Sequence, residues 1–60
     1  MTTAQKNFEI KYVNPRTGEW ETIEVLFNDS AEFPASMWAD DYGYALADKG
    51  QYSIKEVLDN

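Results

Sequence analysis

Three stretches of the chain alternate apolar with polar residues, a period of two that is typical of half-buried β-strands. They cover about residues 8–13, 20–27 and 51–58. The apolar residues that set this period are Phe8, Ile10, Tyr12, Ile23, Val25, Phe27, Tyr52, Ile54 and Leu58. Residues 1–7 are polar and show no period, so we expect them to form a flexible lead-in.

The segment between the first two stretches is rich in turn residues, which predicts a hairpin. Asn14 and Pro15 favour a type I turn, and Gly18 can supply a left-handed residue at the end of the loop. If Val13 lies opposite Trp20, the apolar residues of both strands share one face, whereas a slip of one residue would separate them. The opposite pairs are then Ile10 with Ile23 and Phe8 with Val25, and the reverse face carries Lys11, Val13, Trp20, Thr22 and Leu26.

Between the second and third strands, apolar residues recur at spacings of three and four, which predicts an amphipathic helix over about residues 31–49. The predicted core stripe consists of Ala35, Trp38, Ala39, Tyr42, Ala45 and Leu46. The predicted outer side carries Asp40, Asp41, Tyr44 and Asp48. Gly43 should weaken this helix by up to about 1 kcal/mol relative to alanine.

The ends of the helix are marked by several candidate residues. Ser30 is the expected N-cap, which would place Glu32 in the first turn and Pro34 near the helix start. Ser36 is a second candidate for the cap, so the start is defined only within several residues. Gly50 is the expected C-terminal stop.

The order strand, strand, helix, strand predicts a single α+β domain over residues 1–60. Because the helix returns along the hairpin, the third strand can pair antiparallel to the first, in the spatial order 2-1-3, with the helix packed on one face. The aromatic residues expected to fill the layer between sheet and helix are Phe8, Tyr12, Phe27, Trp38, Tyr42 and Tyr52. Truncating Leu46 to alanine in such a core should cost about 2 to 5 kcal/mol.

Composition removes several classes of function. The chain has 60 residues with no cysteine and no histidine, so disulfides, thiol nucleophiles and zinc-finger patterns are excluded. Asp40 and Asp41 are adjacent on the predicted helix and point about 100° apart, so they cannot converge on one metal ion. We therefore expect a protein that is not an enzyme and uses no cofactor. The absence of a signal-peptide core and of a long apolar run favours a cytoplasmic protein.

The net charge of −6 is concentrated in the middle of the chain. From Thr17 through Asp48 there are eight acidic residues and no lysine or arginine. Nucleic acids and anionic membranes both require basic groups, so neither is an expected partner. The pattern favours a basic protein partner, with the candidate contact residues Asp40, Asp41, Tyr44 and Asp48. The alternative is that this acidic surface only keeps a small protein soluble.

Trp20 is the one large aromatic residue that the predicted register places on the face away from the helix. There it would lie beside Val13, with Leu26 and Val57 as further neighbours, in an apolar patch of the kind that marks contact surfaces. Alternatively, Trp20 shields the end of its own hairpin. Trp20 and Glu24 are therefore further candidate partner-binding residues, and a homodimer formed through this face is the alternative function. Acidic residues oppose pairing at the edge of the second strand, so the chain should be a monomer or a weak face-to-face dimer.

The order of elements, with an aromatic-rich helix running into the strand Tyr52-Ser53-Ile54-Lys55-Glu56-Val57, resembles small phage host-takeover proteins, in particular the T7-type inhibitors of bacterial RNA polymerase. The resemblance implies a compact, phage-encoded strand-strand-helix-strand protein that binds its target through charged residues. The last strand carries Lys55 and Glu56 where that family has arginines. The expected function is to inhibit or modulate a basic nucleic-acid-handling protein, such as a polymerase or a nuclease. The acidic chain would do so by mimicking a nucleic acid.

Overall fold

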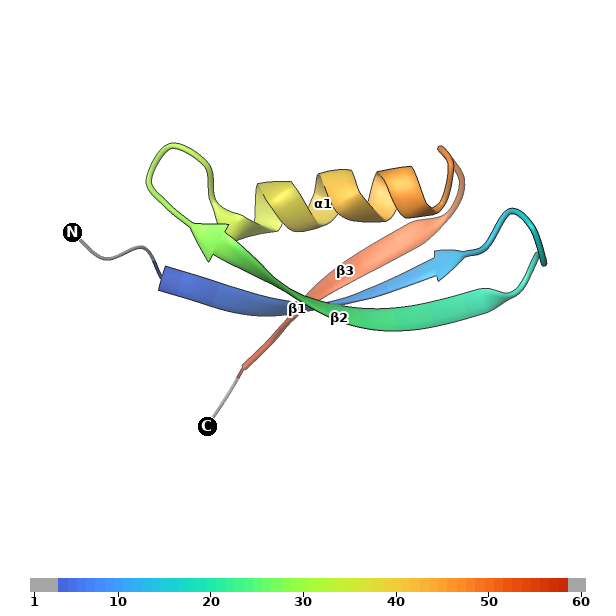
Figure 1. Cartoon of the computed structure of the whole chain (residues 1–60), viewed down its shortest axis with the longest axis horizontal. Helices are drawn as coiled ribbons and strands as arrows, with labels where there is room; N and C mark the ends of the chain where they lie inside the picture. The colour runs from blue at the N-terminus through green and yellow to red at the C-terminus, as the bar shows by residue number, and fades with distance from the viewer. Residues whose placement is uncertain (1–3, 59–60) are drawn as a thin grey trace.

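The computed structural model describes residues 4–58. Its elements in chain order are β1 (Ala4–Val13), β2 (Trp20–Asp29), α1 (Ala35–Leu46) and β3 (Tyr52–Val57). The strands form one antiparallel sheet in the order β2-β1-β3, and α1 lies across one face of it (Figure 1). The predicted α+β class, the strand order and the single covering helix within this range are confirmed.

The hairpin is longer than its alternating pattern predicted. β1 begins at Ala4, so residues 4–7 belong to the sheet and not to a flexible lead-in, and residues 1–3 lie outside the described part of the chain. β2 continues to Asp29, which pairs with Ala4. β3 spans Tyr52–Val57, slightly less than the predicted 51–58.

The register of the hairpin is the predicted one. Ile10 lies opposite Ile23, and Val13 lies opposite Trp20. The Asn14 carbonyl oxygen accepts hydrogen bonds from the N–H groups of Thr17 (3.2 Å) and Gly18 (2.7 Å), which closes the connecting turn. Gly18 has a φ of 75°, the left-handed conformation expected at the end of this loop.

The helix begins later than the capping pattern predicted. α1 starts at Ala35, whose N–H donates to Asp29 Oδ1 at 2.8 Å. Asp29 is the last residue of β2, so the acceptor for the first turn comes from the preceding strand and not from a residue next to the helix. Ser36 lies inside the first turn and is not the cap.

Ser30 closes a separate turn in the loop before α1. Its Oγ accepts the Phe33 N–H at 3.0 Å, and its own N–H donates to the Phe33 carbonyl oxygen at 3.2 Å. Glu32 lies within this loop and not in the first turn of the helix. The prediction of Ser30 as N-cap is wrong because Ser30 stabilises its own local turn.

The end of the helix is also different from the prediction. α1 ends at Leu46, and the next left-handed residues are Asp48 (φ 51°) and Lys49 (φ 69°). The Lys49 N–H donates to the Tyr44 carbonyl oxygen at 3.1 Å, which satisfies an acceptor of the last turn. Gly50 is therefore not the residue that stops the helix.

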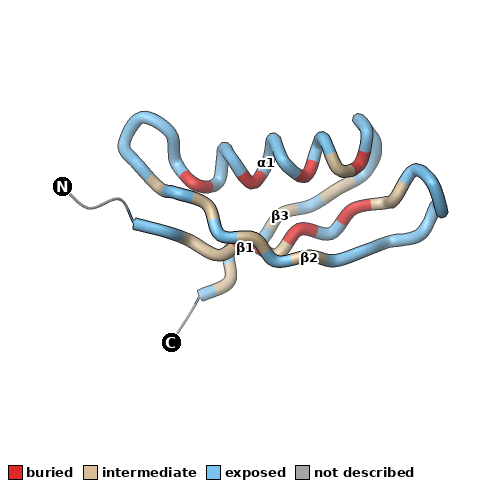
Figure 2. Tube along the Cα trace, viewed as in Figure 1, coloured by how far each residue is buried: buried red, intermediate tan, exposed pale blue. Residues whose placement is uncertain are grey.

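The helix is rotated relative to the predicted core stripe. The buried hydrophobic residues among those described are Phe8, Ile10, Tyr12, Ala35, Ala39 and Ala47. Gly43 is also buried, so small residues at a spacing of four line the sheet side of α1 (Figure 2). Trp38 and Tyr42, predicted as core residues, are 43% and 41% exposed, and Ala45 is exposed as well. Small residues let the helix approach the sheet closely, and the large aromatic rings then lie at its side.

The sheet extends well beyond the helix that covers it. The 12 residues of α1 span about 18 Å, whereas each ten-residue strand of the hairpin spans about 33 Å. The molecule is accordingly elongated and thin, with dimensions of 42 × 25 × 12 Å. The opposite face of the sheet and the turn that joins β1 to β2 are left without a covering layer in the described part of the chain (Figure 1).

Candidate binding surfaces

The acidic residues predicted to bind a partner lie on the exposed side of α1 and at its C-terminal end. Asp40, Asp41 and Asp48 are all exposed. The Tyr52 hydroxyl of β3 donates to Asp40 Oδ1 at 2.8 Å, and the Tyr44 ring packs edge-on against Tyr52 with 6.1 Å between ring centroids. Asp40 and Tyr44 therefore lie on the flank of the helix that faces β3.

The environment of Asp40 alters the chemistry of Tyr52. The hydrogen bond to the Asp40 carboxylate raises the pKa of Tyr52 above its usual value of 10.0, and partial burial and the negative charge of Asp40 raise it further. The tyrosine thus remains a neutral donor to Asp40 near neutral pH. The two ion pairs of the described residues are Lys6 with Asp29 and Lys11 with Glu9, so the acids of the helix take part in neither.

The other two predicted contact residues lie on the opposite side of the sheet. Trp20 is 58% exposed and sits opposite Val13 at the hairpin end. Glu24 Oε1 accepts a hydrogen bond from Asn7 Nδ2 at 2.8 Å. Both side chains point away from α1, since their partners on β1 alternate with its buried residues. The six predicted residues therefore form two separate surfaces.

The uncovered face contains two apolar ends and not one continuous patch. Trp20 with Val13 forms one end, and Leu26, in the same cross-strand row as Val57, forms the other. Trp20 and Leu26 are six residues apart on β2, or about 20 Å, so the expectation that they are neighbours is wrong. The rows between them carry Glu9, Lys11, Thr22, Glu24, Ser53 and Lys55. These rows contain two acidic and two basic residues, so the net negative charge of the protein does not lie on this face.

Glu21 forms a cluster that the sequence analysis did not identify. Its carboxylate accepts hydrogen bonds from the Tyr12 hydroxyl (2.8 Å) and from Asn14 Nδ2 (3.1 Å). The bond to Glu21 raises the pKa of Tyr12 above 10.0, with further increases from burial and from the negative charge of Glu21. The predicted register already placed Glu21 opposite Tyr12, which was the available signal.

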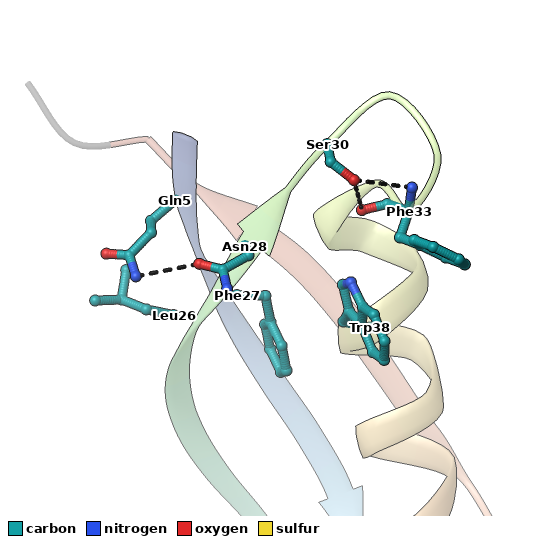
Figure 3. Close-up of a pocket in the computed structure, with 7 residues that line it drawn as sticks. All are labelled: Gln5, Leu26, Phe27, Asn28, Ser30, Phe33 and Trp38. Carbon is teal, nitrogen blue, oxygen red and sulfur yellow. Dashed lines mark hydrogen bonds between the residues drawn. The ribbon is translucent and has the colours of Figure 1, made fainter. Parts of the chain in front are cut away.

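A shallow hollow of about 580 Å³ lies where β2 ends and α1 begins (Figure 3). Its lining residues are Gln5, Leu26, Phe27, Asn28, Ser30, Phe33 and Trp38. The rings of Phe33 and Trp38 lie 5.8 Å apart between centroids, and the two side chains are 48% and 43% exposed. The sequence pattern did not predict this hollow, because Phe33 falls within the predicted helix 31–49 and Trp38 within the predicted core stripe.

The described residues contain no group of three or more acidic, histidine or cysteine side chains placed to hold a metal ion. Between residues 4 and 58, no helix has both the length and the apolar character needed to cross a bilayer. Comparison of the chain with protein-family models, curated proteins and solved structures gave no significant match. The function is therefore inferred from the surfaces of the chain itself.

Proposed function

We propose that this chain is a small, non-enzymatic binding protein of the cytoplasm that inhibits or modulates a basic nucleic-acid-handling protein. A polymerase or a nuclease is the kind of partner that fits, because such proteins carry basic surfaces that normally contact phosphates. The resemblance to phage inhibitors of RNA polymerase points to the same class of target. The chain would compete there by presenting carboxylates in place of phosphates.

The observation that carries the proposal is the exposed acidic surface of α1. Asp40, Asp41 and Asp48 are all exposed, and no lysine or arginine lies between Thr17 and Asp48 in the sequence. A basic partner would therefore meet carboxylates that take part in neither ion pair of residues 4–58. Such complementarity mainly raises the association rate and makes it sensitive to salt.

The test is capture of partners from a bacterial lysate on the immobilised protein at low and at high salt. We expect a basic nucleic-acid-binding protein that is retained at low salt and released at high salt. With that partner purified, Asp41→Asn should weaken binding by up to about fivefold, as expected for an exposed ion pair of 0.2 to 1 kcal/mol. Glu56→Gln changes the net charge equally on exposed β3 and is the matched control, expected to bind like the wild type.

Two results would contradict this proposal. The first is a lysate that yields no salt-sensitive basic partner. The second is an equal effect of Asp41→Asn and Glu56→Gln on affinity, because the partner would then sense net charge and not the surface of the helix.

The uncovered sheet face supports a second candidate function, self-association into a homodimer. In a two-fold arrangement with the strands of the two copies antiparallel, the Trp20 end of one copy can meet the Leu26 end of the other, and the balanced charges between them can pair. Sedimentation at high concentration tests it: the wild type should dimerise and Trp20→Ala should not. A wild-type protein that remains monomeric would remove this candidate.

A further inference from the structure

The outer edge of β2 has a row of main-chain groups that are not used within the sheet. The Asn14 N–H donates toward β2, to the Glu19 carbonyl oxygen at 2.9 Å, and the Val13 N–H donates toward β3, to Gln51 at 3.0 Å. Main-chain groups alternate in direction along an antiparallel strand, so even-numbered residues of β1 direct their N–H and C=O groups toward β2 and odd-numbered ones toward β3. The β2 residues that lie opposite the odd-numbered residues of β1 therefore point their own N–H and C=O groups outward. These residues are Trp20, Thr22, Glu24, Leu26 and Asn28.

The charge along this edge selects the kind of strand that can pair with it. Glu21 and Glu24 accept hydrogen bonds from neutral side chains, and neither takes part in the ion pairs of the described residues. A second copy of the chain pairing through the same edge would bring these carboxylates together, which is unfavourable. A strand that carries lysine or arginine would instead place opposite charges side by side.

The aromatic hollow gives this edge an anchoring point at one end. It begins beside Leu26 and Asn28, whose main-chain groups face outward, and it continues to Phe33 and Trp38 (Figure 3). The Phe33 N–H donates to Ser30 Oγ at 3.0 Å, its carbonyl oxygen accepts the Ser30 N–H at 3.2 Å, and its ring packs against that of Trp38. The anchor is thus partly ordered before binding, which lowers the entropic cost. A strand running along β2 could therefore place an apolar side chain in the hollow.

We propose that the β2 edge binds an extended basic segment of a partner protein as an additional strand, with an apolar side chain of that segment seated on the helix side of the sheet between Phe27, Phe33 and Trp38. Main-chain hydrogen bonds to the edge would supply affinity, and the hollow and the glutamates would supply specificity, as in other cases of strand addition. The inference rests on the proposed function, because the occupant is a segment of the same basic partner.

The probe is a ten-residue synthetic peptide with leucine at both ends and alternating lysine and threonine between them, so that either strand direction brings a leucine to the hollow. Amide hydrogen exchange is followed by NMR with and without the peptide. We expect the N–H groups of Thr22, Glu24 and Leu26 to exchange rapidly in the free protein and to become protected in the complex. Those of Ile23 and Val25, which point toward β1, should be protected in both states.

Two substitutions separate edge pairing from general attraction. Thr22→Pro removes an outward donor at a position where proline is tolerated on an edge strand, and it should weaken peptide binding by about tenfold. Thr22→Val keeps the N–H and should bind like the wild type. Phe33→Ala should weaken binding about fivefold or more through the loss of the anchor, and it leaves the sheet unchanged.

The outcomes distinguish this inference from the proposed function. If the peptide binds but protects no outward amide of β2, and shifts signals of Asp41 and Asp48 instead, the edge site is overturned and the acidic surface of α1 stands. Equal binding by Thr22→Pro and Thr22→Val, or no binding at low salt, would also overturn the edge site. The proposed recognition of a basic protein is judged separately, by the salt-sensitive partner and its response to Asp41→Asn.

Discussion

At Gly43, α1 packs directly against the sheet. A Cβ atom on residue 43 would lie 2.8 Å from Tyr52 Cδ2 and 3.3 Å from Ile10 Cγ2. The first distance is shorter than a van der Waals contact between carbon atoms allows. Glycine is therefore required here for packing, although by intrinsic propensity it is a poor helix residue.

This geometry predicts that Gly43→Ala destabilises the protein. Alanine should gain about 1 kcal/mol from helix propensity, but displacing a packed tyrosine ring and the helix should cost more, giving a net loss of about 1 to 3 kcal/mol. Urea unfolding followed by circular dichroism measures the difference. Asp41→Ala, on the exposed side of the same helix, is the control and should change stability by less than about 0.5 kcal/mol. A Gly43→Ala protein as stable as the wild type would disprove the close approach.

Tyr12 and Tyr52 are both hydrogen-bonded to carboxylates, which predicts the response of the protein to alkaline pH. Their pKa values are raised above 10.0 in the folded state, by Glu21 and Asp40 respectively. A raised pKa in the folded state means that folding favours the protonated tyrosine. The two tyrosines therefore make their full contribution to the free energy of unfolding below about pH 10, which is the pKa of tyrosine in the unfolded chain. This contribution is lost as pH rises through the folded pKa values.

Ultraviolet absorbance titration of the native and the urea-unfolded protein measures this difference. The native protein should contain two tyrosines that ionise at higher pH than in the unfolded chain, and urea unfolding should show stability falling above about pH 10. Tyr12→Phe and Tyr52→Phe should each remove one of the two late transitions. Titration of both groups at or below the unfolded value would contradict the hydrogen bonds described above.

At the scale of elements, α1 is attached to the hairpin through Asp29. The Asp29 carboxylate accepts the Ala35 N–H at 2.8 Å and lies 3.7 Å from Lys6 Nζ, so one side chain connects β1, β2 and the start of the helix. The strand pairing Ala4 with Asp29 extends the sheet to this point. The start of the helix therefore depends on the end of the sheet.

Asp29→Ala should lower the free energy of unfolding by about 0.5 to 2 kcal/mol, as expected for the loss of a helix-capping acceptor. Asp29→Asn keeps an acceptor oxygen and should recover part of the loss. Glu32→Ala, which sequence analysis placed in the first turn, should change stability by less than about 0.5 kcal/mol, because Glu32 is exposed in the preceding loop. Thermal unfolding of the three variants gives the ranking, and a larger loss for Glu32→Ala than for Asp29→Ala would refute this attachment.

At the scale of the whole molecule, the core is a thin layer beneath one helix. Ile10 is the largest side chain that is fully buried among the described residues, at 0% exposure. It lies on the central strand between Ile23 and Ile54. For 60 residues the total stability expected is only about 3 to 9 kcal/mol, so a single core residue can decide whether the chain folds.

Ile10→Ala should therefore cost about 2 to 5 kcal/mol and leave a large unfolded fraction at moderate urea concentrations. Leu46→Ala should lie near the lower end of about 2 to 5 kcal/mol, because Leu46 is only half-buried. Leu26→Ala on the uncovered face should change stability by less than about 0.5 kcal/mol. The urea unfolding midpoints of the three variants test this ranking of stability losses. The ranking is wrong if Leu26→Ala is as destabilised as Ile10→Ala.

The alternation of apolar and polar residues was sufficient to predict three strands, their pairing and their order in the sheet. An alternating pattern has only two possible faces, so placing Ile10 and Ile23 together defined the whole hairpin register. The reverse position of Trp20 follows from the same periodicity, and the structure places it there. Asp40 and Tyr44, predicted on the outer side of the helix, lie instead on the flank of α1 that faces β3.

The rotation and the ends of α1, and with them the hollow beside β2, depend on packing between elements that are distant in the sequence. Hydrophobic periodicity counts Trp38 and Tyr42 as core because it weighs apolarity, whereas close packing favours the small residues Ala39 and Gly43 facing the sheet. The cap comes from Asp29, six residues before Ala35, because tertiary folding brings the strand end to the helix start. Such contacts depend on distances between elements, and no local pattern in the chain encodes them.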